Sequence, residues 1–272
     1  MSYVRPLPRF TRASAPSPMA SDPFFLLVGW LTVLAVAVGK GAFGGGLAML
    51  GVPLLSLAVD PIAAAIMMAP LVAFMDVFAV GAFGPSTWSK PDLAWLLPGL
   101  LAGIALGTIV VGFVDPRIVA LVIAVVTLGF TAHYFLRGRL AEPGRMPVRP
   151  PLALAAGAAS GFTTFVAHAG GPPVALYLLA RGVPKTVFAG TNVAFFVFGN
   201  VLKLPSYIAL GWSRPGVFWA AAALAPAVPL GVWLGKRLHD RLPQQKLFFW
   251  CYLILGCAAL KLLFDALRAL MP

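Results

Sequence analysis

Long apolar segments fill most of the chain, and short stretches rich in glycine, proline or charged residues separate them. A helix that crosses a bilayer needs about 20 mostly apolar residues, whereas strands of a membrane β-barrel alternate apolar and polar positions over about ten. The segments here are continuous, so they predict an all-α polytopic membrane protein. Five apolar segments are expected in each half of the chain, at about 23–39, 45–58, 62–83, 93–113 and 117–136, and at about 151–167, 172–180, 186–210, 216–235 and 247–270.

The composition and the charge agree with a membrane protein. Of the residues, 60% are hydrophobic and 10% are charged, whereas a soluble domain carries about 25% charged residues. The net charge of +12 and the pI near 10.4 would suggest a nucleic-acid partner if the protein were soluble. Cytoplasmic loops of membrane proteins carry an excess of Lys and Arg, and this is sufficient to explain the charge. The expected partner is therefore the lipid bilayer and not nucleic acid.

The chain contains an internal repeat. Residues 88–95 read WSKPDLAW and residues 212–219 read WSRPGVFW, which is an offset of 124 positions. At the same offset Asp76 falls on Asn200, and at an offset of 125 Gly45 falls on Gly170. Fixed-offset similarity is the mark of repeated structural units. We therefore predict four regions: a disordered tail at 1–21, a first transmembrane repeat at 22–136, a basic cytoplasmic linker at 137–149 and a second transmembrane repeat at 150–272.

The basic residues predict how the two repeats are oriented. If the first two segments of each half form a hairpin, three basic loops of the second half lie on one side, which must be cytoplasmic. The equivalent loops of the first half are nearly neutral, as inverted repeats would require. Inversion places both termini outside, and the basic tail before residue 20 counts against it. The basic residues of the three loops are Arg137, Arg139, Arg145, Arg149, Arg181, Lys185, Lys236, Arg237, Arg241 and Lys246.

The basic tail allows a second interpretation of the first apolar segment. Arg5, Arg9 and Arg12, followed by an apolar run, resemble a cleavable signal peptide. The internal repeat instead favours an ordinary first membrane helix, because this segment has a counterpart in the second half.

A glycine-rich stretch interrupts each half near its start. Residues 39–46 read GKGAFGGG and match G-x-G-x-x-G, but they follow an apolar helix and not a strand, so a nucleotide-binding loop is not supported. The segment after each break is too short to span a bilayer. Short, interrupted segments at matching places of two halves point to the binding site of a transporter. We therefore expect each repeat to contain a broken or re-entrant hairpin followed by three spanning helices.

The residues around the two breaks are the first candidate ligands for a substrate. Glycine allows a ligand to approach the backbone closely, and a helix that starts at Pro172 would present N–H groups to an anion. The alternative for glycines is close helix packing, which is expected at Gly99, Gly103 and Gly107. The candidates at the breaks are Gly44, Gly45, Gly46, Thr163, Thr164, Gly170, Gly171 and Pro172.

Several polar residues within the apolar segments are further candidates. A charge inside a membrane is costly and indicates function, so Lys40 is expected to bind the substrate unless its side chain extends to the membrane surface. Asn192, Asn200 and Lys203 can share one face of a helix. A coupling proton is expected at Asp76 or at His168, although a histidine beside a break can also be an ordinary hydrogen-bonded core residue.

The breaks and the polar helix together resemble the TauE/SafE family of sulfite exporters and related anion permeases. The resemblance rests on Gly44–Gly46 with Pro53, on Gly170–Pro172, and on the stretch from Gly190 through Asn192, Asn200 and Lys203 to Gly211. It implies a bacterial inner-membrane transporter for small sulfur-containing anions such as sulfite, sulfonates or sulfoacetate. Lys40 departs from the pattern that we associate with the family.

The expected function is secondary transport of a small sulfur-containing anion, as an exporter, driven by protons or by the membrane potential. A passive anion channel is the first alternative. A membrane-embedded enzyme is less well supported, because the sequence has no H-E-x-x-H or G-x-S-x-G motif and its three histidines lie in different segments. Neither a cofactor nor a metal ion is expected, and assembly into a homo-oligomer is left open.

Overall fold

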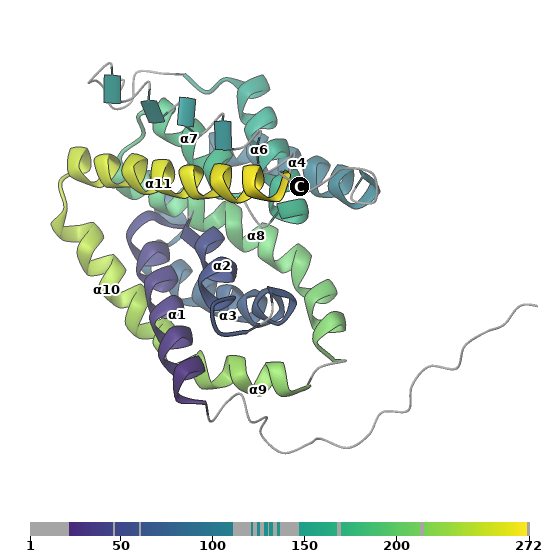
Figure 1. Ribbon diagram of the computed structural model, residues 1–272. Helices are drawn as coiled ribbons and strands as arrows, with labels where there is room; N and C mark the ends of the chain where they lie inside the picture. The colour runs from purple at the N-terminus through teal and green to yellow at the C-terminus, as the bar shows by residue number, and fades with distance from the viewer. Residues whose placement is uncertain are drawn as a thin grey trace, which may run out of the picture.

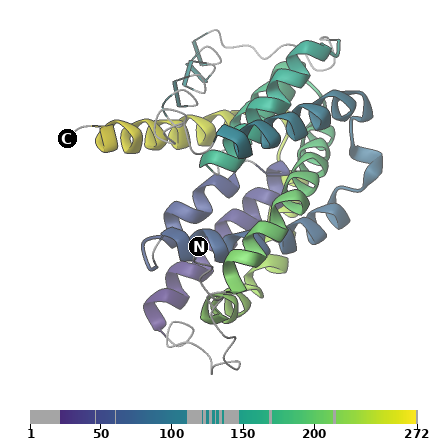
Figure 2. The ribbon, with the colours of Figure 1, turned by 90° about the vertical axis from the view of Figure 1, so that its right-hand side faces the viewer.

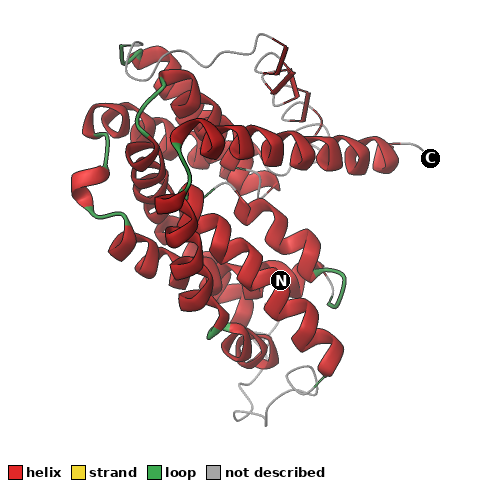
Figure 3. Cartoon of the chain, turned by 90° about the vertical axis from the view of Figure 1, so that its left-hand side faces the viewer, coloured by secondary structure: helices red, strands yellow, loops and turns green. Residues whose placement is uncertain are grey.

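The computed structural model describes residues 22–45, 47–59, 61–110, 147–167, 170–212 and 215–270, and between them positions 121, 124–125, 128–129, 131–132 and 135–136. Within these residues the chain is helical, with short connecting loops and no strand (Figure 3). The all-α prediction is therefore confirmed for the described chain. The tail at 1–21, most of the linker, Gly46 and His168 lie outside the described residues.

Up to Val110, the described part of the first half contains four α-helices and two short 3₁₀ turns. Their bounds are α1 Pro23–Phe43, η2 Leu47–Leu50, α2 Gly51–Leu55, α3 Pro61–Ala82, η3 Pro85–Thr87 and α4 Lys90–Val110. Asp22 caps α1, since its carboxylate accepts from Phe24 N at 3.0 Å. The helix continues four residues beyond the expected end at 39, so Lys40 lies in its last turn rather than in a loop.

Within residues 150–270, the described chain of the second half forms six helices. Their bounds are α6 Pro150–Ala167, α7 Gly171–Arg181, α8 Lys185–Trp212, α9 Pro215–Leu224, α10 Ala227–Arg241 and α11 Gln244–Leu270. The expected single segment 216–235 is divided between α9 and α10. Pro226 lacks the N–H that a continuous helix needs, and Val228 N turns instead to Ala225 O at 3.0 Å.

Two helix pairs, α1 with α10 and α4 with α6, form close contacts between the two halves. The members of each pair run parallel: Gly99 faces Leu154, whereas Gly107 lies further along against Phe165. A Cβ on Gly103 would overlap the carbonyl oxygen of Ala158, so only glycine permits this approach. The packing role expected for these glycines is confirmed. Figure 1 shows α1 and α10 side by side.

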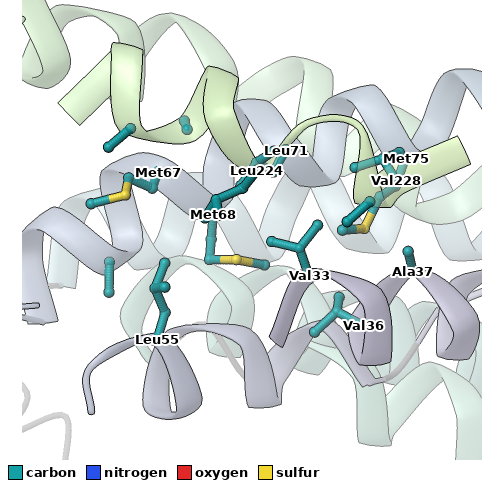
Figure 4. Close-up of a cluster of buried hydrophobic side chains, with 14 of the residues drawn as sticks. Val33, Val36, Ala37, Leu55, Met67, Met68, Leu71, Met75, Leu224 and Val228 are labelled. Atoms are coloured by element: carbon teal, nitrogen blue, oxygen red, sulfur yellow. The ribbon is translucent and has the colours of Figure 1, made fainter. Parts of the chain in front are cut away.

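A methionine-rich core joins the first hairpin to α3 and to the α9–α10 turn. Figure 4 shows Val33 of α1, Leu55 of α2 and Met68 of α3 gathered beneath Leu224 and Val228. Methionine side chains adapt to irregular gaps. The short α2 is thereby held against α3, where Gly51 approaches the Met68 side chain closely.

Three helical stretches of the described chain are long and apolar enough to cross a membrane: Pro23–Phe43, Lys185–Leu202 and Gly216–Arg241. Large apolar side chains also cover outer faces, as Leu27 and Leu31 do on α1 at 61% and 59% exposure. An apolar outer surface suits a lipid environment. Figure 2 shows α11 projecting sideways from the other helices.

Candidate functional site

Lys40 is a buried cation at the end of α1. Its exposed fraction is 2%, and its ammonium group forms an ion pair with Asp76 Oδ1 of α3. The side chain therefore points to a carboxylate within the protein and does not extend to water, so the interfacial alternative is wrong. A buried charge of this kind is tolerated only when it has a partner.

Asp76 holds two partners from two different helices. Besides the ion pair with Lys40, its Oδ2 accepts a hydrogen bond from Asn200 Nδ2 of α8 at 2.7 Å. Asp76 as a whole residue is 5% exposed. Asp76 and Asn200 are the two residues that the sequence offset of 124 equates, and they are in direct contact. The side-chain amide of Asn200 thus already donates a hydrogen bond to Asp76.

The break in α1 is built on two glycines with positive φ. Gly44 has φ +76° and donates its N–H to Lys40 O at 2.9 Å, which ends the helix in a left-handed turn, and Gly45 has φ +144°. A Cβ on Gly44 would overlap the Ala189 carbonyl of α8, and one on Gly45 would lie 2.6 Å from the Phe196 ring. The break therefore fits tightly against α8 because both positions are glycine.

Phe196 links this break to the ion pair. The Lys40 ammonium lies 5.6 Å from the centroid of the Phe196 ring, which is within the range of a cation–π contact. The same ring occupies the space that a side chain at Gly45 would need. Lys40 is consequently enclosed by a carboxylate on one helix and an aromatic face on another.

Asn192 binds a free backbone carbonyl at the C-terminal end of α1. Its Nδ2 donates to Phe43 O at 3.3 Å, and the residue is 2% exposed. Its Oδ1 is buried with no hydrogen-bond partner among the described residues. Asn192 and Asn200 of α8 thus both turn toward the first half, as the predicted polar face requires. The third member of that face, Lys203, lies on α8, but its side chain is outside what is described.

The second break lies between α6 and α7. Ser160 Oγ donates to Gly170 O, Thr163 Oγ1 donates to Ser160 O at 3.3 Å, and a Cβ on Gly170 would lie 2.6 Å from Thr164 Cβ. The expected helix start at the prolines is confirmed, since α7 begins at Gly171 with prolines in its first turn.

The prolines also limit what the start of α7 can offer to an anion. Neither Pro172 nor Pro173 carries an N–H, so Gly171 and Val174 supply the backbone donors of the first turn. The two breaks approach each other, because η2 contacts α7. Lys40 therefore supplies the buried positive charge beside the breaks, whereas the first turn of α7 supplies only two backbone N–H groups.

A second buried carboxylate, Asp92 of α4, was not anticipated. It is 0% exposed and accepts from Ser89 Oγ at 2.6 Å, from Tyr177 OH at 2.6 Å, and from Arg181 Nε and Nη2 at 3.0 and 3.3 Å. One signal was present in the repeat itself: WSKPDLAW carries an acid where the other copy, WSRPGVFW, has Gly216.

A third polar cluster surrounds His239 of α10, which is 1% exposed. Its Nδ1 lies 2.8 Å from Ala42 O, and its Nε2 lies 3.3 Å from Thr186 Oγ1. Lys185 Nζ donates to the His239 and Leu242 carbonyls at 2.7 and 2.6 Å. The cluster connects the start of α8 to the ends of α1 and α10. Its residues form no short sequence motif from which the cluster could be predicted.

Comparison with known proteins places this architecture in a family. The family model for the sulfite exporter TauE/SafE matches residues 29–262, which is most of the 272-residue chain. No curated protein and no solved structure matches the chain. The matched range includes both breaks, the Lys40–Asp76 pair and Asn200. With its apolar helices and its family match, the chain belongs to the TauE/SafE sulfite exporter family of membrane transporters.

Proposed function

We propose that the chain is a secondary transporter that exports small sulfur-containing anions, such as sulfite or organosulfonates, across a bacterial inner membrane. The family supports the substrate class. The single observation that carries the mechanism is the buried Lys40 beside the break in α1, paired with Asp76. A buried cation next to interrupted backbone is the arrangement that membrane transporters use for charged substrates.

The two halves of the transporter are inverted repeats in this proposal. Asp76 and Asn200, which are equivalent by sequence, touch each other, as equivalent residues do beside a two-fold axis. Asp76 contacts Asn200, while Ala79, later in α3, shares a buried cluster with Ala189, earlier in α8, so α3 and α8 run antiparallel. In this proposal α1 is equivalent to α6, and α4 is equivalent to α10. The contact of α1 with α10 therefore has its equivalent in the contact of α6 with α4.

Each repeat contributes a broken or re-entrant hairpin. The 11 residues of α7 extend about 16 Å, which is too short for a hydrocarbon core of about 30 Å. α7 contacts α6, and α2 contacts α1, so each short helix folds back on the helix before it. The substrate path in this proposal passes between the two breaks.

The proposed binding site takes its charge from Lys40 and its remaining contacts from the breaks and α8. Asn192 contributes its amide N–H after leaving Phe43 O. Asp76 carries the coupling proton, with His168 as a second proposed carrier. The other proposed contacts are Gly44, Gly45, Gly46, Thr163, Thr164, Gly170, Gly171, Pro172, Asn200 and Lys203.

The test is anion flux into proteoliposomes. Purified protein should move sulfite or at least one organosulfonate from a panel that includes sulfoacetate, and the variant Lys40→Met should lose this flux. Because Lys40→Met leaves Asp76 buried without its cation, the double variant Lys40→Met/Asp76→Asn is the safer form: removing both charges of a buried pair is often neutral for stability. Lys261→Met, which breaks only the exposed pair with Asp265, is the matched control.

Three results would overturn parts of the proposal. Wild-type protein that moves no member of the panel would remove the substrate class. Unchanged flux in the folded double variant would remove Lys40 from the site. Single-molecule currents faster than a carrier's turnover would replace the carrier with a passive channel.

A further inference from the structure

The Lys40–Asp76 pair is electrically neutral as a unit. Side-chain exposure is 2% for Lys40 and 7% for Asp76, so neither charge is solvated from outside. Asn200, the third member, is uncharged. On α10, which also packs against α3, Lys236 and His239 contact Phe83, which follows the end of α3 and lies seven residues and about 10 Å beyond Asp76. Among the described side chains, Lys40 alone therefore neutralises Asp76.

An anion that binds to Lys40 must change this balance. If the anion takes the place of the Asp76 carboxylate, Asp76 is left charged and buried with only the Asn200 amide as a partner. Removing one partner of a buried ion pair is strongly unfavourable, because the remaining charge has lost its solvation. A proton on the Asp76 carboxylate removes that charge and leaves Lys40 free for the anion.

We propose that each monovalent anion bound at Lys40 is accompanied by one proton on Asp76, so that transport is electroneutral with one proton per anion. This inference rests on the transport function proposed above. The proton comes from the water on the side from which the anion enters and forms an O–H bond on the carboxylate. It leaves on the other side together with the anion, and the Lys40–Asp76 pair then re-forms.

Asn200 acts as a positioning residue in both states. Its Nδ2 donates to the carboxylate when Asp76 is charged, and the same N–H can donate to the carbonyl oxygen of the neutral acid. Phe196 stays beside Lys40 when the carboxylate no longer holds it, because the ring faces the ammonium group from α8. The ammonium group therefore keeps one favourable contact while it exchanges partners.

The net charge of the loaded site also determines which substrate charge is favoured. A monoanion such as hydrogensulfite or methanesulfonate makes the loaded site neutral, since Lys40 cancels its charge and Asp76 is protonated. A dianion such as sulfate leaves one uncompensated negative charge in the site. We therefore expect monoanions to be transported and sulfate to be rejected at the same concentration.

Methanesulfonate is the appropriate probe, because it remains a monoanion over the usable pH range. Proteoliposomes that contain a pH dye should acidify by one proton for each methanesulfonate taken up. The initial rate should be equal within a factor of two at zero membrane potential and at 100 mV of either sign. A net charge that crosses with the anion would instead change its equilibrium accumulation roughly fifty-fold per 100 mV.

Asp76→Asn mimics the protonated carboxyl and gives the decisive comparison. This variant should still exchange labelled for unlabelled methanesulfonate, but net uptake should carry no proton and should follow the membrane potential. Asp265→Asn, at a carboxylate in an exposed ion pair, should retain the one-to-one ratio. Wild-type uptake without acidification, or at a rate that follows the potential, would overturn the inference while leaving the transport function in place. Wild-type protein that moves no anion would overturn both.

Discussion

Two buried carboxylates in this protein, Asp76 and Asp92, have opposite surroundings. Asp92 is held by a hydroxyl from Ser89, a phenol from Tyr177 and two guanidinium contacts from Arg181. Asp76 has only Lys40 and the Asn200 amide. Both side chains are almost completely removed from solvent, so the number and kind of their partners make the difference.

The comparison distinguishes Asp92, whose charge has a structural role, from Asp76, whose cation can exchange partners. At Asp92 every oxygen is saturated, and a fully satisfied polar network makes a structure rigid; it joins the start of α4 to the end of α7. At Asp76 neutrality depends on one flexible lysine beside a glycine break. A carboxylate whose cation makes one contact can lose that cation to a competing anion, whereas a carboxylate with four donors, two of them on one guanidinium group, cannot lose them all at once.

The largest effect is expected from Arg181→Met. The substitution leaves Asp92 charged, 0% exposed and held only by hydroxyl groups, so the free energy of unfolding should fall by about 3–5 kcal/mol. Thermal unfolding in detergent measures the loss. Lys261→Met is the control, because the exposed Lys261–Asp265 pair should contribute less than about 1 kcal/mol. Equal melting temperatures for the two variants would show that Asp92 is not a structural anchor.

A second large effect is expected where the break fits against α8. Gly44→Ala forces a left-handed φ of +76° on an L-residue, which costs about 1–2 kcal/mol. The new Cβ also overlaps Ala189 O, and such overpacking adds about 1–3 kcal/mol. The change should displace Lys40 and reduce anion flux together with stability.

Gly81→Ala is the matched control for the break. Gly81 also lies near the end of a helix, but its Cβ would meet nothing within 4 Å, so the alanine should stabilise the helix by roughly 0.5–1 kcal/mol. If Gly44→Ala melts at the same temperature as Gly81→Ala and transports normally, the tight contact between the break and α8 is not needed.

A ligand-dependent shift in stability distinguishes the two carboxylates most sharply. Asp76→Asn removes the counter-charge of Lys40, so a bound anion should take its place and stabilise the variant by about 2.7 kcal/mol at one hundred times its Kd. Asp92→Asn should gain no more from the same anion than wild-type protein does, because Arg181 lies at the end of α7, away from the break. Melting curves recorded with increasing methanesulfonate measure the difference. A shift in Asp76→Asn no larger than that of wild-type protein would mean that loss of the carboxylate does not free Lys40 for the anion.

The local features of the fold followed from local patterns. The apolar segments predicted the positions of most helices, because exposure to lipid acts on each segment separately. Prolines and glycines predicted the start of α7 and the end of α1, since both residues restrict or release the backbone at their own position. The division at Pro226 was missed because the surrounding residues are uniformly apolar.

The sequence by itself determined the membrane class, the helical content, the two breaks and the candidates Lys40 and Asp76. Only the tertiary structure decided which polar groups meet. Lys40 finds Asp76 36 positions away, Arg181 finds Asp92 89 positions away, and His239 reaches Ala42 across 197 positions. Such pairs depend on which helices pack together and on the register of their packing. The apolar pattern of the sequence determines neither, because many apolar faces can pack with similar energy. Buried charges then select one arrangement, since each must find its partner.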